Sequence, residues 1–171
     1  MAKYKSGYKK ENPQVAVLKT IIAIVGAVLL LVAATFIYDK ATDWKDYSSY
    51  EHLDTYDQIL SQDSDDYVVY FYSKTSTTSV EIKNDVLKVL HDLDQDVYLV
   101  NVDELTEAEV EEDETAYTED TLLAALSIDE LTSPMIVTVA DGDFEEAIIG
   151  KVKIQSVLDQ LESQTYQAFI D

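Results

Sequence analysis

The most hydrophobic part of the chain lies near its amino terminus. Residues 20–38, TIIAIVGAVLLLVAATFIY, contain no charge, and the apolar residues 15–18 precede them across Lys19. About 20 apolar residues are needed to cross a bilayer as a helix, and the stem of a lysine can reach the interface. The segment is apolar on every side rather than along one stripe, which disfavours a buried helix of a soluble protein. We therefore predict a transmembrane helix over residues 15–38.

The charges that flank this helix predict its orientation. Five of the 12 lysines lie at or before residue 19, whereas the acids Asp39, Asp43 and Asp46 follow the apolar run. Because lysines are retained on the cytoplasmic side, residues 1–14 are predicted to form a cytoplasmic tail, and the remainder to lie outside the cell membrane. A cleaved secretory signal is the alternative, since LVAA offers small residues, but its apolar core normally has about 7 to 15 residues. We favour an uncleaved, single-pass signal anchor.

Beyond a connector over residues 39–47, the apolar positions change between helical and extended spacing. Spacings of three and four predict a first helix from Ser48 that carries Tyr50, Leu53, Tyr56, Ile59 and Leu60. Short β-branched and aromatic runs predict strands, with further helices between and after them. The predicted strands are residues 67–72, 97–102, 135–139 and 144–149, and the other predicted helices are residues 76–93, residues 121–126 and one from about Val152.

Two connections between these elements are specific. A strand, a helix and a strand of these lengths form a right-handed βαβ unit, so strands 67–72 and 97–102 are predicted to run parallel. Asp141 and Gly142 separate the last two strands, and Asp-Gly is a strong signal for a two-residue hairpin. Residues 48–163 are therefore predicted to form one α/β domain, followed by a tail over residues 164–171.

Composition narrows the possible functions. The chain has 34 acids, 12 lysines and no arginine, for a formal net charge of −22. Such a surface repels nucleic acid and anionic lipid and favours basic partners, so no nucleic-acid binding is expected. The sequence contains no cysteine, which excludes disulfides, thiolate metal sites and thiol catalysis.

Acidic residues are most concentrated in residues 103–120, DELTEAEVEEDETAYTED. Ten acids and little apolar periodicity predict an insertion or loop outside the core. Such a run can dock a basic partner or hold calcium weakly, but it is more often only solvated. A calcium loop formed by Asp92, Asp94, Asp96 and Asp103 is disfavoured, because Val97 stands where that loop requires glycine. We expect no metal site and no cofactor.

The order of elements resembles that of the thioredoxin family over residues 47–163. The strand YVVYFYS leads straight into a helix, Pro134 in TSPMIVTV stands where the family carries its cis-proline, and Gly150 follows the Asp-Gly hairpin. The chain is most similar to short membrane-anchored or secreted Gram-positive proteins described as thioredoxin-like or bacteriocin-transport accessory proteins. The resemblance implies a mixed four-stranded sheet flanked by helices, preceded here by the transmembrane helix.

The family's redox motif is absent. Laid residue by residue from Phe71, the two cysteine positions of Cys-x-x-Cys fall on Ser76 and Ser79, and the buried acid of the family falls on Tyr70. Disulfide exchange needs a thiolate, whereas a serine hydroxyl stays protonated near neutral pH. Helix capping explains the hydroxyls instead, and Thr78-x-x-Glu81 fits a capping box.

No base for a serine nucleophile is expected near Ser76. The two histidines are His52, on the first predicted helix, and His91. At 1.5 Å per residue, His91 lies about 20 Å from Ser76 along the helix. A serine nucleophile would need an adjacent base, so no catalytic residue is assigned.

The resemblance still implies a binding surface in a groove beside Pro134. In the family an extended segment of the substrate pairs with the backbone next to the cis-proline, a mode of recognition that needs no thiol. The corresponding residues here are Ser76, Thr77, Thr78, Ser79, Ser133 and Pro134. A non-enzymatic protein or peptide partner at the cell envelope is the leading expectation. The alternatives are a serine-substituted form of a thiol-disulfide oxidoreductase and a purely structural spacer or assembly domain.

Overall fold

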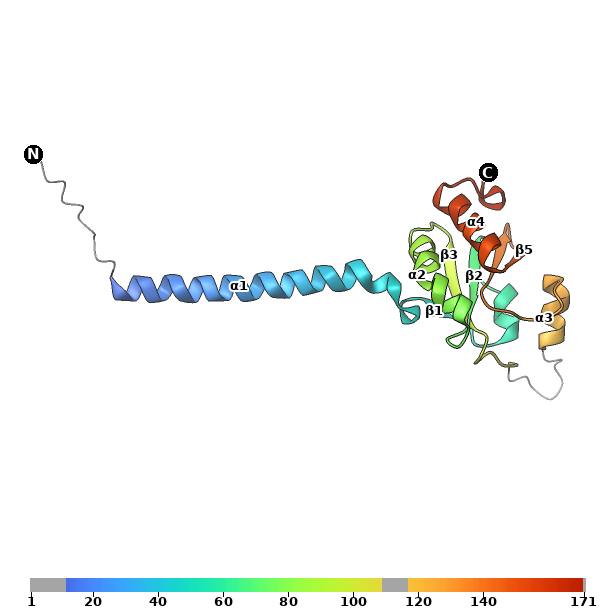
Figure 1. Cartoon of the computed structure of the whole chain (residues 1–171), viewed down its shortest axis with the longest axis horizontal. Helices are drawn as coiled ribbons and strands as arrows, with labels where there is room; N and C mark the ends of the chain where they lie inside the picture. Colours follow the sequence, from blue (N-terminus) through green and yellow to red (C-terminus); the bar gives the residue numbers. More distant parts are fainter. Residues whose placement is uncertain (1–11, 109–116, 171) are drawn as a thin grey trace, which may run out of the picture. The chain divides into compact units, whose positions relative to one another are not determined.

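The computed structural model describes residues 12–108 and 117–170 and divides the chain into two units, Met1–Asp43 and Trp44–Asp171. The first unit contains the helix α1 (Pro13–Thr42; Figure 1). It begins after Asn12, whose side-chain Oδ1 accepts a hydrogen bond from the N–H of Gln14 at 3.2 Å. Pro13 suits the first turn because it has no N–H to satisfy. Residues Pro13–Tyr38 are long and apolar enough to span a membrane.

The side chains of α1 suit a lipid environment. Its large apolar residues are exposed, as shown by Leu30, with 73% of its surface accessible. The hydroxyls of Thr20 and Thr35 donate to the helix carbonyls of Ala16 and Val32, at 3.0 and 2.8 Å, so neither requires water. An apolar helix with no covered face is unlike a core helix of a soluble domain.

The second unit is built on a five-stranded mixed sheet. In space the strands follow the order β1-β3-β2-β4-β5. β3 runs parallel to both β1 and β2, whereas β4 is antiparallel to both β2 and β5. The strands are β1 (Glu51–His52), β2 (Tyr67–Tyr72), β3 (Asp96–Asn101), β4 (Met135–Ala140) and β5 (Asp143–Ile149).

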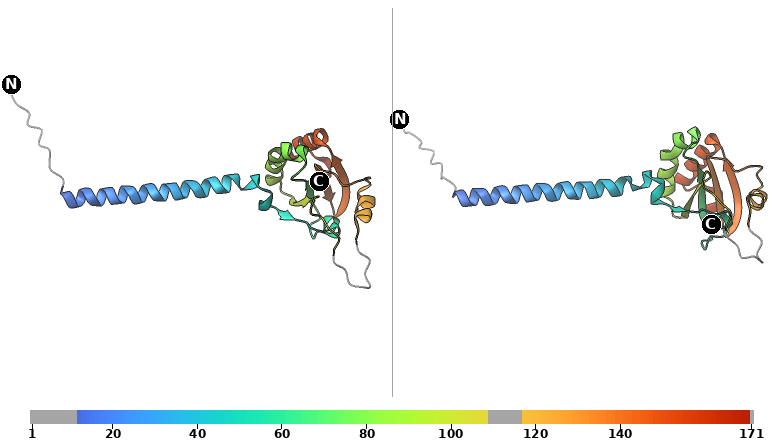
Figure 2. Two further views of the ribbon diagram at one scale, coloured as in Figure 1. Left: turned by 60° about the horizontal axis from the view of Figure 1, so that its bottom comes forward. Right: turned by 90° about the horizontal axis from the view of Figure 1, so that it is seen from below.

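Helices cover both faces of this sheet, and each face has its own apolar core (Figure 2). On one face, α2 (Thr77–His91) and α4 (Lys151–Glu162) pack against β2 residues such as Val68 and Tyr70. On the other, α3 (Glu119–Leu126) and the 3₁₀ helix η3 (Tyr56–Leu60) pack against Val69 and Phe71. Successive side chains of β2 point to opposite faces of the sheet and pack in the two different cores. All six of its residues are therefore buried.

The other described elements are short 3₁₀ helices near the two ends of the second unit. They are η1 (Asp43–Lys45), η2 (Tyr47–Ser49) and η4 (Gln167–Phe169). The segment with η1 and η2 is tied to α2, because the hydroxyl of Tyr50 donates to the carbonyl of Leu87 at 2.7 Å.

The helix predicted from Ser48 to Leu60 is wrong. That segment forms η2, the two-residue strand β1 and η3, so the sheet has one strand more than the four predicted. Tyr47 packs in the core beneath α2, whereas Leu53 and Ile59 pack in the core beneath α3. A single helix packs on one face of a sheet, so it could not place these side chains in the cores on both faces. The N–H of Leu53 donates to the carbonyl of Leu99 at 2.9 Å, and this long-range pairing replaces the local helical bond.

The other predicted elements are confirmed to within a few residues, including the parallel pairing of β2 with β3. The Asp-Gly hairpin is confirmed as well. Asp141 and Gly142 both have positive φ, 53° and 79°, which is the backbone that this two-residue turn requires. The N–H of Gly142 donates to the carbonyl of Asp65 at 2.8 Å, so the turn is also held by the segment before β2.

Contrary to the prediction, the acidic stretch 103–120 does not lie wholly outside the core. Leu105 and Tyr117, near its two ends, pack against the core beneath α3. The N–H of Thr106 donates to the carbonyl of Asp54 at 3.0 Å, and α3 begins at Glu119. Residues 109–116, which hold five of the ten acids, lie outside the described residues.

Candidate functional site

Ser73 organises the turn between β2 and α2. Its side chain is buried, and its Oγ accepts hydrogen bonds from the N–H groups of Thr75 and Ser76, at 3.1 and 3.2 Å. The same hydroxyl donates to Oδ2 of Asp103 at 2.7 Å. Asp103 follows β3, so this bond ties the ends of two neighbouring strands together. The sheet therefore fixes the position at which α2 begins.

Ser76 is the N-cap of α2. Its Oγ accepts a hydrogen bond from the N–H of Ser79 at 3.3 Å and lies 3.4 Å from the carbonyl oxygen of Ser133, to which it donates. Ser76 is half-buried, whereas Ser79 is fully buried and its Oγ accepts from the N–H of Ser73 at 3.4 Å. The capping hydroxyl is thus shared between the helix start and the loop before β4.

The capping box predicted over Thr78 and Glu81 is not formed, because the N-cap of α2 lies two residues earlier, at Ser76. Glu81 instead pairs with Lys151, whose Nζ lies 2.8 Å from Oε1 of the glutamate. This ion pair links the beginning of α2 to the first turn of α4. Both side chains are accessible to solvent, so its contribution to stability is at most about 1 kcal/mol.

The loop before β4 contacts the start of α2 through Ser133. The peptide bond between Ser133 and Pro134 is cis, as predicted, and Pro134 is buried. The carbonyl of Pro134 accepts a hydrogen bond from the N–H of Gly150 at 3.4 Å. Among the described residues, the backbone N–H of Ser133 has no hydrogen-bond partner. Three loops thus converge at the start of α2.

Two exposed valines lie at the beginnings of the two helices that start here. Val80, in the first turn of α2, exposes 57% of its surface, and Val152, in the first turn of α4, exposes 80%. The ion pair between Glu81 and Lys151 joins the two turns that carry them. Large apolar side chains at such exposure are expected where a partner docks, although singly they are also common on protein surfaces. We refer to the region around the start of α2, with Ser76, Ser133, the buried Pro134 and the two exposed valines Val80 and Val152, as the proline surface.

Tyr70 lies beneath the start of α2, at the β2 position where the resemblance places the family's buried acid. Its hydroxyl is buried near the hydroxyls of Tyr47 and Ser79 but makes no hydrogen bond of normal geometry to a described residue. Burial raises the pKa of Tyr70 far above its ordinary value of 10.0. The phenol therefore stays protonated near neutral pH and cannot take up a proton as a carboxylate would.

Neither histidine forms a hydrogen bond with Ser76 in the part of the chain that the structure describes. Nε2 of His52 lies 2.9 Å from the carbonyl oxygen of Tyr47, and His91 is the last residue of α2, at the far end of the helix from Ser76. No group of three or more metal-binding side chains is found within the described ranges. The sequence contains no thiol, and no histidine hydrogen-bonds to Ser76 within residues 12–108 and 117–170.

Several solved structures that resemble this domain are thioredoxins. A mutant thioredoxin from Halobacterium salinarum NRC-1 is 22% identical over 61% of this chain and 78% of its own, with a TM-score of 0.42. Mitochondrial thioredoxin 3 from Saccharomyces cerevisiae is 16% identical over 68% of this chain and 97% of its own, with a TM-score of 0.48. Thioredoxin O2 from Arabidopsis thaliana is 21% identical over 68% of this chain and 97% of its own, with a TM-score of 0.45. No protein-family model matches the sequence, and no curated protein matches it significantly.

The strand order β1-β3-β2-β4-β5, with a cis-proline immediately before β4, decides the fold. The domain has a thioredoxin-like fold. Within it, Ser76 lies half-buried at the helix start and Ser79 lies buried one turn later. The predicted site residues Ser76, Ser79, Ser133 and Pro134 are brought together, with Thr77 exposed and Thr78 half-buried beside them.

Sequence reasoning missed two parts of this site. Ser73 and Asp103 lie 30 residues apart, and only the parallel pairing of β2 with β3 places their side chains together. Val80 and Val152 each resemble an ordinary apolar helix position, and nothing in the sequence marks them as exposed. The loop between β5 and α4 is also part of this site. Its signal in the sequence is Gly150, which follows β5 and has φ 91°.

Proposed function

We propose that this protein is a membrane-anchored accessory factor whose external thioredoxin-like domain binds an extended segment of a partner protein. Binding takes place at the proline surface and involves no redox chemistry. The observation that carries the proposal is the backbone N–H of Ser133, which has no hydrogen-bond partner among residues 12–108 and 117–170 and lies beside helix starts that carry two exposed valines. An extended peptide can accept a hydrogen bond from this N–H and place apolar side chains on Val80 and Val152.

The anchor supports a role at the cell envelope. The apolar helix α1 is preceded by lysines, and the residues that follow it are strongly acidic: residues 44–171 contain six lysines against 31 acids. Positive charge is retained in the cytoplasm, so the acidic domain would lie outside. An anchored domain is held near partners at the same membrane, which raises its effective concentration for weak peptide contacts.

A thiol-disulfide oxidoreductase in which serines replace both cysteines is the second candidate. It is favoured by the arrangement of Ser76 and Ser79, one accessible and one buried at a helix amino terminus. Both candidate functions use the proline surface. They differ in whether the protein has cysteines or serines at positions 76 and 79 when it performs its function.

Protease added to intact cells or protoplasts is expected to remove the acidic domain and spare the amino-terminal tail. The reason is the asymmetry of charge on the two sides of α1. Immunoblotting with tags at each end of the full chain measures this result. A domain that resists protease in intact cells but is degraded after lysis would reverse the proposed topology.

Photo-crosslinking tests the proline surface itself. Benzoylphenylalanine introduced at Val152 of the anchored chain is expected to give one defined crosslinked product, because this exposed side chain belongs to the proposed peptide contact. The matched control places the same residue at Gln160, an exposed position near the other end of α4. In the Val152 background, Val80→Asp is expected to reduce the product several-fold.

Absence of a product at Val152, or an equal product at Gln160, would contradict peptide binding at the proline surface. That outcome would favour a spacer role for the domain. Retention of the product in the Val80→Asp variant would show that capture at Val152 does not depend on this surface.

A further inference from the structure

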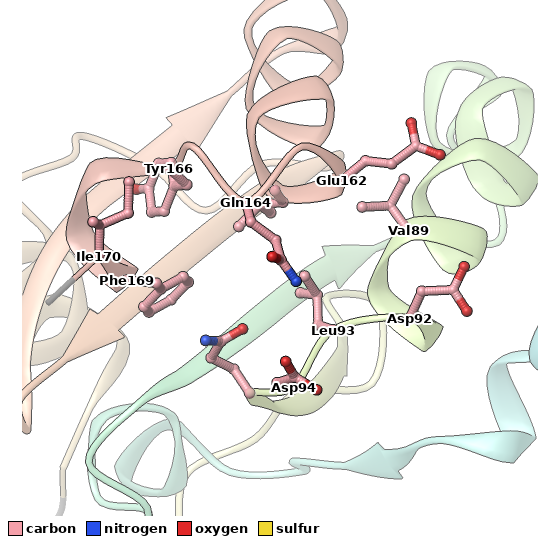
Figure 3. Close-up of a pocket in the computed structure, with 11 residues that line it drawn as sticks. Val89, Asp92, Leu93, Asp94, Glu162, Gln164, Tyr166, Phe169 and Ile170 are labelled. Atoms are coloured by element: carbon pink, nitrogen blue, oxygen red, sulfur yellow. The ribbon is translucent and has the colours of Figure 1, made fainter.

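A second candidate surface is a concave one at the carboxyl ends of α2 and α4. It has a volume of about 530 Å³ and lies between the turn after α2 and the last residues of the chain (Figure 3). At 1.5 Å per residue, the end of α2 is about 22 Å from its start, so this hollow is separate from the proline surface. Its lining comes from the last turn of α2, the turn that follows it, the end of α4 and the segment that contains η4.

The floor of this hollow is apolar. Val89 and Leu161 belong to the core, and the partly buried Phe169 packs beside Tyr166 with ring centroids 5.3 Å apart. Ile170 exposes 47% of its surface at the edge. Among the described residues of the second unit, the exposed large apolar side chains are Val80, Val152 and Ile170. One of the three therefore lies here, against an apolar floor rather than alone on a convex surface.

An adjoining hollow extends this surface along the helices. It has a volume of about 410 Å³, and both hollows are lined by Val89 and Glu162. Asp85 of α2 and Asp159 of α4 contribute to its walls. From Asp85 to Asp92 the helix advances about 10 Å, or nearly two turns. We call the two hollows together the seam groove, because both are lined by residues of α2 and α4. The two hollows share lining residues along α2 and α4, so a length of polypeptide can contact both.

Negative charge surrounds the seam groove. Its carboxylates are those of Asp85, Asp92, Asp94, Asp159 and Glu162. Lys88 is the cation in the lining, and its Nζ lies 3.4 Å from Oε1 of Glu162, with both side chains more than half exposed. An exposed pair of this kind neutralises little of the surrounding charge. The groove therefore repels acidic segments and anionic lipid and complements a cationic occupant.

We propose that the seam groove binds a partner-protein segment in which apolar side chains are flanked by lysines or arginines. The apolar side chains enter the hollow against Phe169 and Ile170, and the flanking cations face Asp92, Asp94 and Glu162. Apolar burial provides affinity, and complementary charge provides selectivity and a faster encounter. This inference does not depend on the proline surface or on the presence of a thiol.

The test uses the full chain in phosphatidylcholine nanodiscs and a fluorescent synthetic peptide of alternating lysine and leucine. Binding is measured by fluorescence anisotropy, with empty nanodiscs as the background. The triple variant Asp92→Asn, Asp94→Asn, Glu162→Gln is expected to weaken binding about tenfold, because it removes the charges at the rim with little change in side-chain size. Ile170→Ser, which removes an exposed apolar side chain, is expected to weaken binding several-fold.

A matched triple variant separates the seam groove from the general acidity of the domain. Asp63→Asn, Asp120→Asn and Glu107→Gln remove the same charge from exposed positions that do not line either hollow. This variant is expected to bind nearly as well as the unchanged protein. If both triple variants lost peptide binding equally, the binding would reflect the general acidity of the domain, and the proposal would be wrong. Unchanged binding by the Ile170→Ser variant, or equal binding of a glutamate-leucine peptide, would overturn it as well.

Discussion

Ser76→Cys combined with Ser79→Cys is expected to give the cysteine-free domain an internal disulfide and measurable thiol-disulfide activity. Ser76 caps α2 with its Oγ 3.3 Å from the backbone nitrogen of Ser79, so the two residues lie on one turn. Residues three apart at a helix start can be bridged after small rotamer changes. The positive end of the helix stabilises a thiolate, which lowers the pKa of the thiol introduced at position 76.

The activity of this double variant is expected to be weak. The resemblance places the proton acceptor of the family at Tyr70, whose phenol burial keeps protonated. Insulin reduction with dithiothreitol measures the activity, and titration of free thiols before and after reduction measures the disulfide.

The matched control variant, Thr77→Cys with Val80→Cys, has the same spacing between its two cysteines but moves the pair one residue along the chain. Neither of these positions is the N-cap, so lower activity is expected. If the unmodified chain reduced insulin, the hypothesis that this domain has no redox activity would be wrong. Failure of the Ser76→Cys, Ser79→Cys variant to form a disulfide would show that these positions do not correspond to the family's motif.

Alkaline solution is expected to unfold the domain cooperatively as the pH rises from about 10 through about 12. Burial raises the pKa of Tyr47 to about 12 from its ordinary value of 10.0. The pKa of Tyr72 is likewise raised to about 12, chiefly by burial, with nearby carboxylates adding to the shift. Burial is also the largest cause of the higher pKa values of Tyr70 and Tyr166.

The sign of this effect follows from the difference between the folded and unfolded states. An unfolded tyrosine loses its proton near pH 10, whereas these folded tyrosines keep theirs to a higher pH. Their contribution to stability is therefore fully present below about pH 10 and is lost as the pH rises through the folded pKa values. Tyrosinate absorbance and circular dichroism, followed together on the full chain, measure the transition.

The variant Tyr70→Phe tests this account, because it should raise the alkaline midpoint. It should also add up to about 1 kcal/mol to the free energy of unfolding near neutral pH. The removed hydroxyl is buried and makes no hydrogen bond of normal geometry to the described residues, so little is lost with it. Tyr117→Phe is the control, because that side chain is only partly buried. A midpoint unchanged by Tyr70→Phe, or tyrosines that all titrate near pH 10 in a folded domain, would contradict this account.

Local sequence predicted the elements whose stability comes from their own residues and nearest neighbours. The uncharged run from Thr20 to Tyr38 predicts α1 because length and hydropathy alone decide whether a helix suits a bilayer. The aromatic and β-branched run of β2 and the Asp-Gly turn are equally local, since backbone preference determines both. The alignment of Ser76 and Ser79 with the redox positions of the family also used only the distance in sequence from Phe71, and it stays a prediction.

Only the tertiary structure decided the segment from Ser48 to Leu60 and the contacts of the candidate site. Apolar residues at helical spacing there serve two cores on opposite faces of the sheet, and bonds to β3 outweigh a weak local preference for helix. The bond from Ser73 to Asp103 and the meeting of Ser76 with Ser133 join residues far apart in sequence. Sequence spacing determines which side chains share a strand or a helix face, whereas strand order and packing determine which of those faces meet.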